Sequence, residues 1–303
     1  MTGLYHLARL NDRWFRLDEP LVSAFVKRWR PETHTFHMPF RECTITLQDV
    51  AYQLGLPVDE HYVSSFLTDF HVYIDGGRPA WVWFKELLGV LPPANQVQKF
   101  AVNCTWFQET FGECPAGADE ETVRQFARAY IMMLLGTQLF ADKSDNRIHI
   151  RWLPYVARLE EMDGYSWGSA ALAWLYMCMC RVANRHVVKL AGPLQLLQSW
   201  IFWRFPRFRP AGYDEFNWPL ASRWSGHNPS GSEKGPRVQM WRLMIDMLQA
   251  RDFIWMPYSS PDVLQVVHPE FWHVHWENYV DHVLRFDVVA DLGPSHDFLN
   301  WWS

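Results

Sequence analysis

The chain has 303 residues, of which 49% are hydrophobic and 20% are charged, and its formal net charge is −5. This composition excludes a disordered or low-complexity chain and allows a sizeable core in one large domain or two ordinary ones. A negative chain offers no overall field for nucleic acid, so only a local basic patch could bind it. The longest apolar run, 170–180, is about half of the ~20 residues that a membrane-spanning helix needs, and no signal-peptide pattern is present, so we expect neither a membrane protein nor a secreted one.

The first predicted elements are short and clearly bounded. Apolar residues at helical spacing predict a helix over 21–29, which must end near Arg30 because Pro31 restricts the preceding residue. Residues 35–40 then read as extended. Thr46 and Asp49 form a capping box at the start of a second helix, which we expect to stop at the following Gly-Leu-Pro, 55–57.

Similar start and stop signals bound the elements predicted in the rest of the chain. Further helices are predicted over 81–88, 96–111, 120–140, 169–183, 193–205 and 238–249, and short extended pieces over 147–152 and 253–255. Residues 206–236 are rich in Pro, Gly, Ser and Asn and are predicted as a flexible loop. Aromatic residues continue on both sides of it. We therefore predict one large, mainly α-helical domain over 1–303 with a few short β-strands.

The segment 164–168 matches the Gly-x-Ser-x-Gly pattern of a serine-hydrolase nucleophile elbow. An elbow needs an apolar strand before it, and the charged segment 158–163 shows no strand alternation. The alternative interpretation is a helix N-terminus capped by Ser166 or Ser169. We favour the cap and predict no catalytic residue.

Metal and cofactor chemistry has little support. His268, His273, His275 and His282 lie near carboxylates, but only the last two would share a helical face. The phosphate loops of nucleotide sites are absent, and neither Lys85 nor Lys189 has the glycines of a pyridoxal phosphate site beside it. The odd number of cysteines, five, contains no CxxC pair and fits a reducing compartment. We predict neither metal nor cofactor.

The best local candidate for a binding site is the run 203–209, in which Trp203, Arg204, Arg207 and Arg209 interleave with aromatic rings. Such a pattern suits stacking on nucleic-acid bases or pairing with an acidic peptide. The alternative interpretation is a helix C-terminus whose arginines compensate the dipole while its rings enter the core.

Several motifs together resemble a known family. They are Leu-Val-Ser-Ala-Phe-Val (21–26) leading into Arg-Trp-Arg-Pro-Glu-Thr-His-Thr-Phe-His (28–37), Thr-Ile-Thr-Leu-Gln-Asp-Val-Ala (44–51), Leu-Gly-Leu-Pro-Val (54–58), Arg-Trp-Leu-Pro (151–154), Tyr-Ser-Trp-Gly (165–168), Leu-Leu-Gln-Ser-Trp (196–200), Trp-Arg-Phe (203–205) and Trp-Met-Pro-Tyr (255–258). In this order they resemble the plant mobile domain of MAIN-like proteins, which plant transposons also carry. The resemblance covers nearly the whole chain.

The resemblance implies a helix-rich nuclear domain that acts in transposon silencing, genome integrity and meristem maintenance by binding protein. It also implies a plant serine/threonine phosphatase of the type-seven class as partner. Trp29 and Arg30 join the 203–209 run as candidate binding residues. The second possibility is a transposon-derived domain that binds chromatin or nucleic acid. The family's "aminotransferase-like" label finds no pyridoxal site in this sequence to support it.

One departure from the family pattern is expected to matter. Near 270–271 the chain passes directly to what resembles the family's terminal segment, so an internal apolar strand is missing. Loss of a buried strand exposes apolar surface, and we expect a version with this segment restored to be more stable. A degraded transposon copy, a splice variant and a faulty gene model would each explain the gap.

Overall fold

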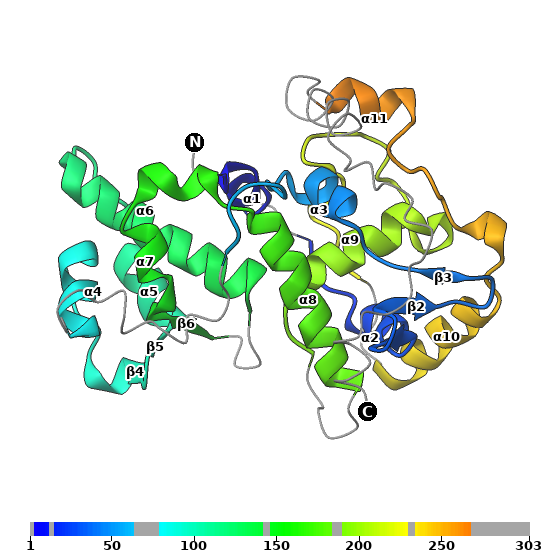
Figure 1. Cartoon of the computed structure of the whole chain (residues 1–303), viewed down its shortest axis with the longest axis horizontal. Coiled ribbons are helices and arrows are strands. Elements are labelled where there is room, and N and C mark those ends of the chain that lie inside the picture. Colours follow the sequence, from blue (N-terminus) through cyan, green and yellow to red (C-terminus); the bar gives the residue numbers. More distant parts are fainter. Residues whose placement is uncertain are drawn as a thin grey trace, which may run out of the picture. The chain divides into compact units, whose positions relative to one another are not determined.

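A computed structural model describes residues 3–11, 15–63, 79–141, 146–183, 190–229 and 234–267 (Figure 1). By its internal contacts the chain divides into two units, Met1–Val266 and Val267–Ser303. The description that follows concerns the first unit. The predicted gap near 270–271 and the four C-terminal histidines lie outside the described residues, as does Lys189.

The predicted fold class, mainly α-helical with a few short strands, is confirmed. The α-helices are α1 (Tyr5–Asn11), α2 (Glu19–Val26), α3 (Leu47–Leu54), α4 (Ala80–Leu88), α5 (Cys104–Phe111), α6 (Glu120–Leu134), α7 (Leu153–Val156), α8 (Trp167–Ala183), α9 (Leu194–Arg204), α10 (Lys234–Asp246) and α11 (Pro261–Val266). The strands are β1 (Trp29–Arg30), β2 (Thr35–His37), β3 (Glu42–Cys43), β4 (Val97–Gln98), β5 (Ala101–Asn103) and β6 (Arg147–His149). In the part of the chain that the structure describes, no helix is long and apolar enough to cross a membrane.

The first sheet follows α2 and has the antiparallel order β1-β2-β3. The predicted helix over 21–29 starts two residues too late, since α2 begins at Glu19. The observed helix also ends earlier than predicted, because Trp29 pairs with Phe36 across the β1–β2 register. The extended segment after it is confirmed as β2. Trp29 and Phe36 are both buried, so the hairpin directs one face into the core.

Helix α3 begins and ends as predicted. Thr46 caps it in a capping box with Asp49, and Gly55 ends it in the left-handed conformation with φ of 64°. Any other residue at position 55 would be strained by the positive φ. Its Cβ would also lie only 2.9 Å from the His6 side chain.

The predicted helix over 96–111 is wrong in its first half. Residues 94–96 form a 3₁₀ turn, β4 and β5 form a hairpin, and only α5 is helical, with Asn103 as its N-cap. Lys99 in the hairpin turn has a positive φ of 56°, which a helix does not allow. Strand β5 also pairs with β6, a partner far along the sequence, and this long-range pairing outweighs the local helical pattern.

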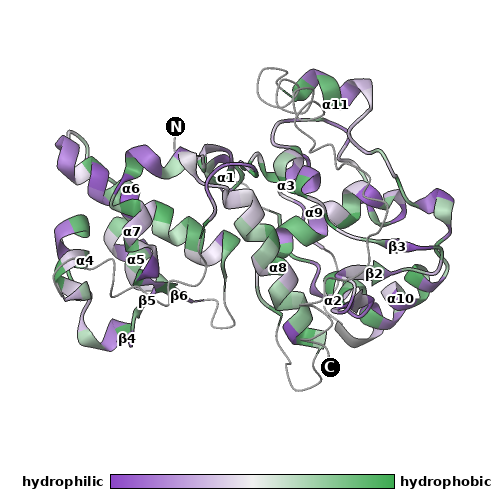
Figure 2. Cartoon of the chain, viewed as in Figure 1, coloured by the Kyte–Doolittle hydropathy of each residue, from purple (hydrophilic) through white to green (hydrophobic). Residues whose placement is uncertain are grey.

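Helices α8 and α9 form the centre of the unit. Figure 2 shows α8 largely in green and white with little purple, which matches its mostly apolar sequence. Every residue of α9 from Leu196 to Arg204 is buried, so this helix is enclosed on all sides. Helix α10 packs mainly on α2 and begins at Lys234, four residues before its predicted start. The predicted helix over 120–140 is α6, continued by a π-helical turn, Leu135–Leu139.

The predicted flexible loop, 206–236, contains regular structure in its described part. It includes the 3₁₀ turns η6 (Pro206–Phe208) and η7 (Leu220–Trp224), and Leu220, Ala221 and Trp224 are buried. Its segment after α9 therefore adds apolar side chains to the core. The extended piece predicted over 253–255 is not a strand in the described structure; a 3₁₀ turn, η8 (Ala250–Asp252), precedes it.

Candidate functional site

The run 203–209 spans the end of α9 and the turn η6. The helix stops at Arg204 because Pro206 disfavours a helical conformation at the residue before it, and Phe205 has φ of −124° and ψ of 88°. Trp203 and Phe205 are both buried, at 2% and 0% exposure. These rings therefore belong to the core, as the alternative interpretation predicted. Any binding function of the segment depends on its arginines.

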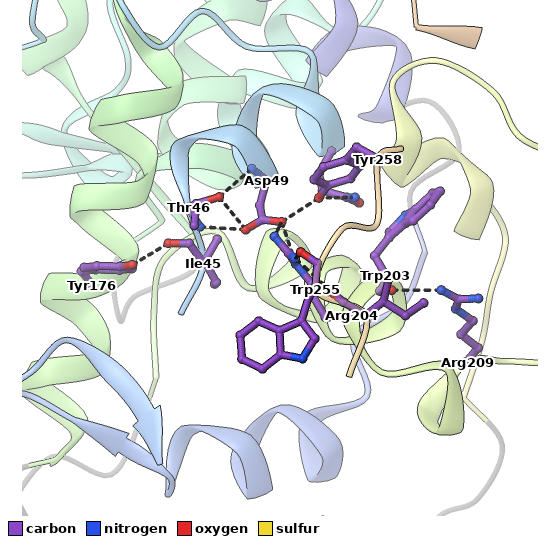
Figure 3. A network of polar contacts seen from close by, with 11 residues as sticks. Ile45, Thr46, Asp49, Tyr176, Trp203, Arg204, Arg209, Trp255 and Tyr258 are labelled. Carbon is purple, nitrogen blue, oxygen red and sulfur yellow. Dashed lines mark hydrogen bonds and ion pairs between the residues drawn. The ribbon is translucent and has the colours of Figure 1, made fainter. Parts of the chain in front are cut away.

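Arg204 is an internal residue, paired with Asp49 of α3 (Figure 3). Its Nε and Nη2 atoms donate to the same carboxylate oxygen, Asp49 Oδ1, at 3.1 and 2.7 Å. Its Nη1 atom donates to the backbone carbonyls of Ile254 and Trp255, at 3.1 and 2.8 Å. Arg204 is 6% exposed and Asp49 is fully buried. Each charge is thereby compensated inside the protein, as a buried charge must be.

The Asp49 carboxylate also organises its own helix. Its Oδ2 atom accepts from the backbone N–H and the hydroxyl of Thr46, each at 2.8 Å. The residue that completes the capping box with Thr46 is therefore the same residue that holds Arg204. Asp49 thus links the start of α3 to Arg204 at the end of α9, and Arg204 in turn holds residues 254–255.

The hydrogen bonds extend beyond this pair into what we call the polar network: Asp49, Gln53, Ser199, Arg204, Trp224 and Tyr258. The Tyr258 hydroxyl donates to Asp49 Oδ1 at 2.7 Å and accepts from Gln53 Nε2 at 3.1 Å. Ser199 donates to Gln53 Oε1, and the Trp224 indole N–H donates to the Ser199 hydroxyl at 3.1 Å. Burial, reinforced by the nearby Asp49 charge, raises the pKa of Tyr258 well above its ordinary value. The hydroxyl therefore stays protonated and keeps donating.

The remaining arginines of the run are more accessible. Arg207 is exposed, whereas Arg209 is half-buried and donates to the carbonyls of Phe202 and Trp203 at 2.6 and 2.9 Å. The guanidinium of Arg209 lies 6.0 Å from the centre of the Trp203 ring, and Arg223 of η7 lies 5.3 Å from the same ring. Arg223 carries no local signal in the sequence, because it stands alone in a segment that reads as a loop.

Trp29 and Arg30 occupy a different place. The Trp29 ring is buried against Phe36 and Tyr176, with centroid distances of 5.0 and 4.9 Å, and its indole N–H donates to Cys180 Sγ. Arg30 is exposed on β1. Both residues line a cavity of about 950 Å³ between α2 and residues 190–195, and no residue of the 203–209 run lines it. The structure therefore does not unite the six predicted residues in one site.

The Gly-x-Ser-x-Gly segment does not have the geometry of a nucleophile elbow. The preceding residues form a 3₁₀ turn, η5 (Leu159–Gly164), and no strand. Ser166 is 3% exposed, and its hydroxyl donates to the backbone carbonyl of Glu60 at 2.6 Å. An elbow instead exposes its serine to a histidine base. Ser169 likewise donates to a carbonyl, that of Val58.

Other candidates for chemistry can be placed only in part. Lys85 lies exposed on α4. His37 of β2 contacts Glu42 of β3 at 3.3 Å, which is an ordinary cross-strand pair. Among the described residues, no group of three or more histidine, cysteine or carboxylate side chains is arranged to hold a metal ion.

Comparison with known proteins identifies the class. A family model described as plant mobile domain matches residues 3–302, and the chain belongs to this family. It is 34% identical over 282 residues to a serine/threonine-protein phosphatase 7 long form homolog of Arabidopsis thaliana, covering 86% of this chain and 20% of that protein. It is 35% identical to Protein MAIN-LIKE 1 and 34% identical to Protein MAINTENANCE OF MERISTEMS, both of the same plant, covering 80% and 82% of this chain and 46% and 51% of those proteins.

The chain thus spans about half or less of the length of these relatives. No solved structure matches it. The family membership that the sequence motifs indicated is therefore confirmed.

Proposed function

We propose that this plant mobile domain is a non-catalytic protein-interaction module of the plant nucleus that works with a serine/threonine phosphatase of the type-seven class. The supporting observation is the match of 86% of the chain to one fifth of a phosphatase 7 long form homolog. The phosphatase 7 long form homolog thus contains a segment similar to this domain. We infer that such a domain also binds a phosphatase of this class when the two are separate polypeptides. Transposon silencing, genome integrity and meristem maintenance are the processes in which we place this pairing; the similarity to a protein named for meristem maintenance supports the last of them.

The non-catalytic part of this proposal is supported by the Ser166 geometry. A hydroxyl that is 3% exposed and committed to the Glu60 carbonyl is poorly placed to attack a substrate. We expect no labelling of the purified protein by a fluorophosphonate probe. Labelling that disappears in Ser166→Ala would establish a serine hydrolase instead. A pyridoxal absorbance band that tracks Lys85 or Lys189 would likewise establish cofactor chemistry.

The surface that meets the phosphatase is a second part of the proposal. Of the six predicted residues, Arg30, Arg207 and Arg209 are accessible to a partner, whereas Trp29, Trp203 and Arg204 are buried. Arginine is favoured at interfaces because its planar guanidinium makes bidentate bonds and stacks on rings. A partner would therefore contact the three accessible arginines, while the buried residues hold the backbone that presents them.

The pairing can be tested by affinity purification from plant nuclei. We expect the intact domain to recover the phosphatase, and the exposed-surface variants Arg30→Glu and Arg207→Glu to recover less of it. Arg158→Glu is the matched control, because Arg158 is also exposed but lies just before η5, where it pairs with Glu161. Circular dichroism should show that all three variants are folded. Absence of any phosphatase in the eluate of a folded wild-type domain would contradict the pairing.

A further inference from the structure

Two arginines from different turns lie against one indole ring. The guanidinium carbons of Arg209 and Arg223 are 6.0 and 5.3 Å from the centre of the Trp203 ring. Arg223 also lies 4.4 Å from the centre of the Phe216 ring. These distances are within the range of cation–π attraction. Both guanidinium groups therefore lie near the Trp203 ring.

Backbone carbonyls fix the orientation of the two guanidinium groups. Arg209 Nε and Nη2 donate to Phe202 and Trp203, and Arg223 Nε donates to the Tyr213 carbonyl at 2.6 Å. Arg209 Nη1 and both Nη atoms of Arg223 make no hydrogen bond to any other described residue. Three N–H-bearing groups are thus positioned in advance and remain available to a ligand.

The positive charge of this pair is poorly compensated within the described residues. Burial lowers the pKa of Arg209, and the charge of Arg223 lowers it further; burial also lowers the pKa of Arg223, against a smaller opposing effect of Asp214. Asp214 is exposed and makes no ion pair with either arginine in the described structure. Trp203 adds a buried indole N–H that lacks an acceptor among the described residues, which is uncommon in folded proteins.

We propose that Arg209 and Arg223, held against Trp203 and Phe216, form a binding site for a phosphorylated serine or threonine side chain of a partner protein. Two uncompensated cations match a phosphomonoester, which carries about −1.5 to −2 charges at pH 7 and three acceptor oxygens. A carboxylate would compensate only one of them. Guanidinium groups suit phosphate because they donate in a planar fork.

A protein ligand fits this surface better than nucleic acid does. The chain has a net charge of −5, and the exposed carboxylates Asp214 and Glu215 lie on the same segment as the arginine pair. These negative charges disfavour a polyphosphate backbone, since nucleic-acid affinity depends on many neutralised phosphates. A single phosphorylated side chain needs only one site. This inference stands on the geometry of residues 202–223 and does not depend on the phosphatase pairing.

Calorimetric titration of the full chain with the peptide Ala-Ala-phosphoserine-Ala-Ala, capped at both ends, tests the site. We expect saturable binding that weakens as salt is raised. Arg223→Gln should weaken it by about tenfold or more, because a charge-assisted hydrogen-bond pair is lost. Arg209→Gln should do the same. Arg158→Gln is the matched control, since this arginine is exposed and belongs neither to the pair nor to the proposed phosphatase surface, and it should bind like wild type.

A conservative variant separates loss of the site from loss of the fold. Arg223→Lys keeps the charge but loses the planar group, and we expect intermediate binding with a cooperative melting transition that shows the fold is retained. The glutamate version of the peptide should bind at least tenfold more weakly, because it carries one charge. Equal binding of the two peptides, or no binding by the folded wild-type chain, would overturn the proposal. A third result would also overturn it: the wild-type chain binds single-stranded DNA but not the phosphopeptide, and the same arginine variants lose the DNA binding.

Discussion

Two parts of the interior are both rich in aromatic residues but differ in how many buried polar groups they contain. The polar network around Asp49 and Arg204 buries an ion pair, an amide and hydroxyl groups between α3, α9 and residues 254–258. The aromatic cluster joins α4, α5 and α6 through ring contacts; its members are Phe84, Trp106, Phe107, Phe111 and Phe126. Ring packing is tolerant of small changes, whereas a buried polar network requires every partner. The first region therefore specifies how distant segments align, and the second mainly supplies buried area.

The largest expected effect comes from Arg204→Met in the polar network. It leaves Asp49 buried without its cation and frees the carbonyls of Ile254 and Trp255, and we expect a loss of about 3–5 kcal/mol in the free energy of unfolding. Urea denaturation measures this loss. A change within experimental error of zero would show that water reaches the pair.

Tyr258→Phe removes one hydroxyl from the same network. Asp49 and Gln53 each lose a partner, and we expect a loss of about 2 kcal/mol at neutral pH. Because burial raises the pKa of Tyr258 in the folded state, the unfolded chain loses this proton first when the pH rises above about 10. The wild-type chain should therefore lose stability above that pH more steeply than Tyr258→Phe, and melting curves between pH 7 and 11 would show it. Parallel curves would contradict the assigned burial of the hydroxyl.

Phe107→Leu probes the aromatic cluster, where Phe107 is fully buried. The ring contacts are lost but no polar group is left without a partner, so we expect a loss of about 1.5 kcal/mol. This loss should be independent of pH between 7 and 11. A cost above that of Arg204→Met would reverse the comparison between the two regions.

Thr46→Ala gives the smallest effect of the series. It removes a cap whose hydroxyl accepts from the Asp49 backbone N–H at 3.2 Å, and we expect a loss of about 1 kcal/mol. Thr46→Ser keeps the cap and is the control. A loss in Thr46→Ala as large as in Tyr258→Phe would indicate that Thr46 also positions the Asp49 carboxylate for Arg204.

Local signals in the sequence predicted much of the fold but, within the polar network, only the capping role of Asp49. The capping box of Thr46 and Asp49 and the stop at Gly55 could be found because all three residues lie within ten positions. The partner of Asp49 is 155 residues away, and no local pattern connects the two. Arg204 was consequently predicted from its neighbours as a binding residue or as a dipole-compensating residue at a helix end, whereas the structure buries it against Asp49.

The candidate site was limited in the same way. Arg209 was predicted from the interleaved run of residues. Arg223 could be assigned to the site only from the structure, in which η7 places it against Trp203. Strand β5 shows the same limitation in the fold, since its pairing with β6 replaced half of a predicted helix. In each case the missing information is a contact between segments distant in sequence.

The central claim, that the Asp49–Arg204 pair stabilises the interior as a unit, is tested most directly by a double-mutant cycle. The variants are Asp49→Asn, Arg204→Met and their combination, and the measured quantity is the free energy of unfolding in urea. We predict that the double variant loses less than the sum of the single losses, by about 1–3 kcal/mol, because the second substitution removes a charge that the first has left unpaired. Additive losses would contradict the account and show that the two residues stabilise the protein independently.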